Sequence, residues 1–212
     1  MHDSMVAHQF DDREQQRDTA RFGMWTFLAT EVLFFGGMFT AYIEYRSLHP
    51  QAFVIGSNHL DYWLGTINTA LLLLSSLTMA LAVHGAQDGK RSRSALFLLL
   101  TIVLGAAFLG IKFHEYARHF QEGMVPGPHF AYRGPFAGQV QLFMSLYFLM
   151  TGMHALHMTI GIMLLTVMLF LTLSGRITRA WHSPVVVCGL YWHFVDIVWI
   201  FLYPCFYLVG SK

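Results

Sequence analysis

The chain has 212 residues, of which 55% are hydrophobic and only 12% are charged, and its formal net charge is +1. Soluble globular domains carry about 25% charged residues, so the composition excludes an ordinary soluble domain. The near-neutral charge also argues against a nucleic-acid partner. The apolar residues lie in long uncharged blocks, which predicts an all-α, polytopic membrane protein.

Five apolar segments follow one another, each long enough to cross a bilayer, which takes about 20 residues. The predicted spans are residues 22–45, 62–84, 95–116, 138–174 and 183–209. The fourth is longer than one crossing needs, so we expect it to tilt or to project from the bilayer. We therefore expect a polar N-terminal tail, residues 1–20, and a five-helix transmembrane domain, residues 21–212.

In the first span, Glu31 is the only charged residue before Glu44. A carboxylate near the middle of a bilayer costs roughly 3 kcal/mol or more. One interpretation is a site that handles protons or contacts lipid. The other is a protonated side chain that only hydrogen-bonds a neighbouring helix, and position alone favours neither.

Lys112, Glu115 and Tyr116 enter near the end of the third span. Lys112 and Glu115 are three residues apart and share a helix face, so we expect an interfacial ion pair. In this interpretation the lysine extends toward the membrane surface. The next segment, residues 117–137, is rich in Pro and Gly and includes His119 and His129, which indicates an ordered surface loop.

The fourth span contains His154 and His157, which also share one helix face. Gly152 and Gly161 flank them, and small residues are typical of faces that pack against another helix. Two histidines here are candidates for metal ligands, haem ligands or a proton relay. The more common alternative is a polar contact between packed helices.

The fifth span carries His193 and Asp196, again three residues apart. Such a pair can hydrogen-bond on one helix face, which lowers the cost of burying both groups. We expect a structural clasp, with a proton path or a ligand site as the alternative.

Basic residues are unevenly divided between the two predicted sides of the membrane. One side carries Arg13, Arg17, Arg21, Lys90, Arg91, Arg93, Arg176 and Arg179, and the other carries Arg46, Arg118, Arg133 and Lys212. Cytoplasmic loops are enriched in Lys and Arg, so we expect a cytoplasmic N-terminus and an external C-terminus.

Five segments together resemble subunit III of the haem-copper oxidases, and they occur in the order found in that family. They are residues 23–31, 68–76, 108–116, 151–157 and 191–199. Seven-helix members have two more helices before the glutamate helix, whereas a polar tail of about twenty residues stands here. The sequence therefore resembles the short, five-helix bacterial form.

The resemblance implies an accessory, non-catalytic subunit of a respiratory complex that reduces dioxygen and pumps protons across a bacterial inner membrane. It implies partners in oxidase subunits I and II, which hold haem and copper, and no redox cofactor in this chain. The histidines His154, His157 and His193 would be structural contacts. Glu31 would support proton uptake or hold a phospholipid. The chain as a whole would contact membrane lipids.

Several alternatives stay open beside this interpretation. The loop lengths and the His-rich outer loop favour a cytochrome c oxidase over a quinol oxidase or an accessory protein of nitric oxide reductase. A different class is a haem b membrane anchor, with His154 or His157 and His193 as axial ligands from two helices. A transporter is disfavoured because we find no internal repeat.

Overall fold

The computed structural model describes residue 10 and residues 12–210, and within them the chain is helical without a β-strand. The helices are α1 (Arg13–Leu48), α2 (Pro50–Asn58), α3 (Tyr62–Gln87), α4 (Arg91–Gln121), α5 (Ala137–Leu173) and α6 (Ser183–Tyr207). Five of the described helices, all except α2, are long and apolar enough to cross a membrane. The predicted all-α, five-span architecture is thus confirmed.

Helix bounds differ from the prediction at three places. α1 begins eight residues before residue 21, because Asp12 caps it and accepts a hydrogen bond from the backbone of Gln15 at 2.7 Å. Residues 13–20 of the predicted tail are therefore helical, and residues 1–9 and 11 lie outside the described part. The short α2 was not predicted, and Pro50 in its first turn is typical of a helix start. α4 extends to Gln121, so His119 is a buried helix residue and not part of a loop.

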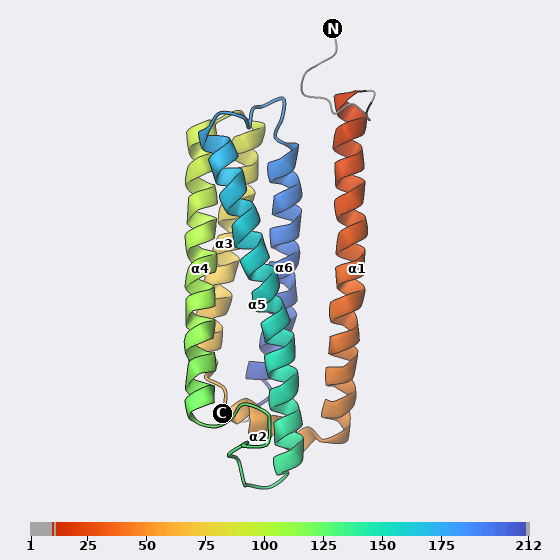
Figure 1. Ribbon diagram of the computed structural model, residues 1–212, viewed down its shortest axis with the longest axis vertical. Helices are drawn as coiled ribbons and strands as arrows, with labels where there is room; N and C mark the ends of the chain where they lie inside the picture. Colours follow the sequence, from red (N-terminus) through yellow and green to blue (C-terminus); the bar gives the residue numbers. More distant parts are fainter. Residues whose placement is uncertain (1–9, 11, 211–212) are drawn as a thin grey trace.

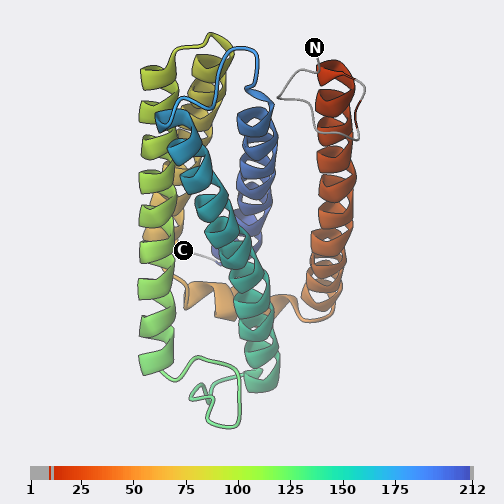
Figure 2. The ribbon, with the colours of Figure 1, turned by 45° about the horizontal axis from the view of Figure 1, so that its top comes forward.

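The helices α3, α4, α5 and α6 form a bundle, and α1 stands at one side of it (Figure 1). In both views α5 runs obliquely past its neighbours, and its 37 residues span about 55 Å, more than one membrane thickness. α2 lies across the end of the bundle at which α1 ends (Figure 2). The long fourth span is therefore inclined relative to the other helices of the bundle.

A narrow apolar stripe attaches α1 to the rest of the molecule. Leu28, Phe35 and Tyr42 recur at seven-residue intervals and are 6%, 3% and 1% exposed. The Tyr42 hydroxyl donates to the carbonyl of Cys205 on α6. Most other apolar side chains of α1 are exposed, so α1 presents a wide face to lipid or to another subunit.

One tryptophan holds the four-helix bundle together at its centre. Trp192 of α6 is fully buried and donates from its ring nitrogen to Ser75 of α3 at 3.1 Å. A Cβ atom at Gly105 of α4 would lie 2.7 Å from this ring, and one at Gly161 of α5 would lie 3.0 Å from it. The two glycines therefore make room for the ring, as small residues do between membrane helices.

Candidate functional site

Glu31 and His157 form a direct contact between α1 and α5. The distance from Glu31 Oε2 to His157 Nε2 is 3.0 Å, and the side chains are 17% and 11% exposed. The other ring nitrogen, Nδ1, lies 2.8 Å from the carbonyl oxygen of Met153. Both nitrogens of His157 are therefore occupied by partners within the chain.

These contacts limit where protons can be on the pair. A carbonyl oxygen only accepts, so Nδ1 of His157 carries a hydrogen. A carboxylate against a neutral ring in this tautomer would place two acceptors 3.0 Å apart. One proton is therefore shared between Glu31 and Nε2, giving either two neutral groups or an ion pair, and both forms have zero net charge.

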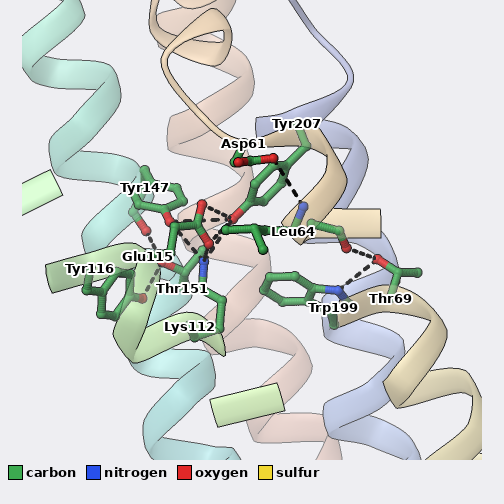
Figure 3. Close-up of polar contacts among 11 residues, drawn as sticks. Asp61, Leu64, Thr69, Lys112, Glu115, Tyr116, Tyr147, Thr151, Trp199 and Tyr207 are labelled. Atoms are coloured by element: carbon green, nitrogen blue, oxygen red, sulfur yellow. Dashed lines mark hydrogen bonds and ion pairs between the residues drawn. The ribbon is translucent and has the colours of Figure 1, made fainter. Parts of the chain in front are cut away.

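A second polar cluster is built around Lys112, in the C-terminal half of α4 (Figure 3). Its ammonium donates to Glu115 Oε2 at 2.9 Å and to the hydroxyls of Tyr147 and Tyr207, each at 2.8 Å. The Tyr207 hydroxyl lies 2.8 and 3.0 Å from the two oxygens of Glu115 and donates to that carboxylate. Lys112 thus has three hydrogen-bond acceptors, and these hydrogen bonds link α4, α5 and α6.

The predicted position of this ion pair was wrong. Lys112 is 1% exposed and Glu115 is 0% exposed, so the pair is buried in protein and the lysine does not extend toward the surface. Tyrosines from two other helices provide the reason, because their hydroxyls supply the hydrogen bonds that water would supply at the interface. The rings of four aromatic residues also lie 4.8 to 5.5 Å from the ammonium.

Neighbouring hydroxyls extend this network, as Figure 3 also shows. Thr151 donates to the carbonyl of Tyr147 at 2.5 Å, so the Tyr116 hydroxyl must donate to Thr151 across 2.6 Å. Trp199 donates to Thr69 at 3.1 Å and links α6 to α3.

His154 lies in a different environment from His157, although the two residues share a helix face. It is 1% exposed and packs against the rings of Phe108 and Trp199 at centroid distances of 5.5 and 5.2 Å. Neither of its nitrogens has a hydrogen-bond partner among the described residues. Its ring therefore bridges helices by apolar contact.

The predicted hydrogen bond between His193 and Asp196 is absent from the described part of the chain. His193 Nδ1 instead contacts the hydroxyl of Ser76 on α3 at 2.9 Å. Asp196 is 3% exposed and lies beside Ser76, but its carboxyl oxygens have no hydrogen bond of ordinary geometry. The clasp therefore joins α6 to α3 through Ser76, and the histidine does not satisfy the acid.

The described residues contain no group of three or more His, Cys, Asp or Glu side chains placed to hold a metal ion. The haem-anchor alternative needs a histidine with a free nitrogen as axial ligand. His157 does not offer one, because Glu31 and Met153 occupy both of its nitrogens.

Three participants of these clusters were missed from the sequence: Ser76 as the partner of His193, and Tyr147 and Tyr207 as partners of Lys112. A lysine inside a predicted span was itself a signal, since a buried ammonium requires several acceptors.

Known proteins match this chain over nearly its whole length. The family model described as cytochrome c oxidase subunit III matches residues 7–211. Quinol oxidase subunit 3 of Bacillus subtilis is 31% identical over 200 residues, which cover 93% of this chain and 92% of that protein. Cytochrome bo(3) ubiquinol oxidase subunit 3 of Pseudomonas aeruginosa is 29% identical over 97% of this chain and 92% of its own length.

A relative named as a cytochrome c oxidase subunit is also similar to this chain. Cytochrome c oxidase subunit 3 of Scyliorhinus canicula is 35% identical over 198 residues, covering 90% of this chain and 70% of that protein. The match to the family model and the identity to these relatives show that the chain belongs to the cytochrome c oxidase subunit III family.

Proposed function

We propose that this chain is the accessory third subunit of a haem-copper terminal oxidase in a bacterial inner membrane. It packs on subunit I, in a complex that also contains subunit II, and supports oxygen reduction without a redox centre of its own. Family membership, five membrane-spanning helices and bacterial relatives named as oxidase subunits support this proposal.

The contact between Glu31 and His157 is the observation that supports a role for this chain in supplying protons to the oxidase. The pair shares one proton and is neutral whichever group holds it, so a proton can move across it without creating net charge in the membrane. Both side chains are partly exposed, at 17% and 11%, so the contact lies at the edge of the α1–α5 interface and not deep inside it.

The substitution Glu31→Gln tests this role. The amide can still donate to His157 Nε2, so the complex should assemble, but an amide cannot take up and release a proton at neutral pH. We expect normal co-purification with subunit I and a steeper fall of oxygen consumption at alkaline pH, where protons are scarce. An unchanged pH profile in a fully assembled complex would overturn the proton role.

We propose cytochrome c as the electron donor, as the loops favour, and quinol as the second candidate. The quinol alternative is supported by relatives named as quinol oxidase subunits that match this chain over 92% of their length. Oxygen consumption by the purified complex with reduced cytochrome c, and then with a quinol, separates the two. Consumption of nitric oxide instead of oxygen would contradict both.

We also propose that the end of the bundle where α1 begins is cytoplasmic. The start of α1, the α3–α4 connection and the α5–α6 connection lie at this end, and they carry the larger basic group (Figure 1). A cysteine introduced at Lys90 should react with a membrane-impermeant thiol reagent in inverted vesicles and not in intact cells. The reverse pattern would contradict this orientation.

A further inference from the structure

Three buried polar side chains in the four-helix bundle lack partners within the described part of the chain. They are Asn68 of α3, His154 of α5 and Asp196 of α6, and each is 3% exposed or less. Each has two polar side-chain atoms, and none of these six atoms has a hydrogen-bond partner among the described residues. Buried polar atoms are almost always hydrogen-bonded, because an unpaired one is costly. These six atoms therefore favour a partner from outside the chain.

The ring of Trp199 marks the place where the three side chains meet. His154 packs against this ring with the two centroids 5.2 Å apart. Asp196 precedes Trp199 by three residues, so the two lie on one face of α6. Trp199 donates to Thr69 at 3.1 Å, as Figure 3 shows, and Asn68 is the residue before Thr69. The unpartnered atoms thus belong to one layer of the bundle.

A glycine of α3 shows that Asn68 faces this layer. Gly65 lies three residues before Asn68 on the same helix face. A Cβ atom at Gly65 would lie 2.8 Å from the ring of Tyr207, and that ring lies 6.3 Å from the ring of Trp199. The helix face that carries Asn68 is therefore turned toward α6 and the interior of the bundle.

The chemistry of the layer favours water as the ligand. The amide of Asn68 can donate and accept, and so can a neutral imidazole such as His154. The ammonium of Lys112 lies 5.4 Å from the centroid of the Trp199 ring, which disfavours a second cation, and the acid Asp196 disfavours an anion. Water is neutral, donates and accepts, and occurs inside folded proteins at about one buried molecule per 27 residues.

We propose that the bundle of α3, α4, α5 and α6 binds water molecules in the layer around Trp199, where they bridge Asn68, His154 and Asp196. The bound water links three helices in addition to the direct hydrogen bonds of the Lys112 cluster. The site lies within this chain and depends neither on a proton role of Glu31 nor on the electron donor of the complex.

X-ray footprinting of the intact complex tests this site. Intense X-rays split bound water into hydroxyl radicals, which oxidise the side chains next to it, and mass spectrometry of the peptides locates the oxidised residues. Trp192 is the internal reference, because it is as fully buried as Trp199 on the same helix. The Trp192 ring packs against Gly105 and Gly161, and its nitrogen already donates to Ser75. We expect Trp199 to be oxidised several times more than Trp192.

Two variants make the footprint specific. Asn68→Leu with His154→Phe removes four of the six unpartnered atoms at similar side-chain size, and should lower the oxidation of Trp199 to the level of Trp192. Thr172→Val is the matched control. Thr172 is also buried on α5, but its hydroxyl already donates to a backbone carbonyl of that helix at 2.8 Å, so this variant should leave the oxidation unchanged.

The stability of Asn68→Leu separates a hydrated layer from a dry one. In a dry layer, the variant replaces unmet polar atoms with apolar ones, which should raise the midpoint of unfolding in a denaturing detergent. In a hydrated layer, it leaves the bound water without one of its partners, so we expect the midpoint to fall.

Three outcomes would overturn the proposal. One is equal oxidation of Trp199 and Trp192 in the unaltered complex, a measurement that needs no variant to assemble. Another is an equal effect of Thr172→Val and of the double variant on the oxidation of Trp199. The third is a raised midpoint of unfolding for Asn68→Leu, which would mean that the layer is dry.

Discussion

Lys112→Met should destabilise the bundle strongly, because it removes the cation from a cluster that otherwise stays buried. Methionine has a similar length and preserves most of the packing volume. The carboxylate of Glu115 would then keep only the Tyr207 hydroxyl among the partners described above, at 0% exposure. The loss of stability comes from a buried carboxylate without its cation and not from a cavity.

The magnitude follows from the number of contacts that are lost. Lys112 makes three hydrogen bonds of 2.8 to 2.9 Å, one of them to a carboxylate, and lies near four aromatic rings. Removing one partner of a buried ion pair typically costs about 3–5 kcal/mol. Because this pair is hydrogen-bonded on both sides, we expect a value within that range.

A double-mutant cycle separates the stranded charge from general damage. Glu115→Gln alone should cost less, since the amide oxygen still accepts from Lys112. The double variant, Lys112→Met with Glu115→Gln, should be more stable than the sum of the single effects predicts, by about 2 kcal/mol or more.

Unfolding of the purified complex, titrated with a denaturing detergent at fixed lipid content, measures these free energies. Lys90→Met is the matched control, because Lys90 forms an ion pair of the same 2.9 Å length with Asp88 but is 55% exposed. This control should change stability little. Equal effects of Lys112→Met and Lys90→Met, or strict additivity in the cycle, would refute the reasoning.

Three further outcomes follow from single contacts. Glu31→Ala should lower stability by about 1–3 kcal/mol in the same unfolding titration, because it leaves His157 Nε2 without its partner, and a loss equal to that of Glu31→Gln would contradict this. Ser76→Ala should cost about 1 kcal/mol by removing the hydroxyl that binds a histidine of α6, and a neutral result would show that the contact is not stabilising. Gly105→Ala should cost about 1–3 kcal/mol because its Cβ meets a tryptophan ring at 2.7 Å, whereas Gly110→Ala, with no atom within 4 Å, should be neutral or stabilising.

The membrane spans were predictable because hydropathy is a local property of the sequence. The uncharged runs locate α3, α5 and α6 within a few residues. α2 was missed because nine residues are too few to produce a spanning signal, and its position depends on contacts with α5. The early start of α1 depends on one capping residue, Asp12, which lies outside the apolar pattern.

The site was predictable in its residues and only partly in its contacts. Glu31 and His157 were candidates, but 126 positions separate them in the chain, and no sequence pattern pairs them. Lys112 was placed at the membrane surface because the tyrosines that receive its hydrogen bonds are 35 and 95 positions away. Local spacing also wrongly paired His193 with Asp196, since helix packing placed Ser76 closer to the ring.

This chain belongs to the subunit III family, and we propose that it carries no redox centre of its own. The most direct measurement is purification in mild detergent through a tag on this chain, followed by mass spectrometry and a reduced-minus-oxidised visible spectrum. We predict that large haem-bearing subunits co-purify and that the chain is colourless once it is separated from them. A haem b spectrum retained by the isolated chain would contradict the account, because its histidines would then be ligands and not contacts between helices.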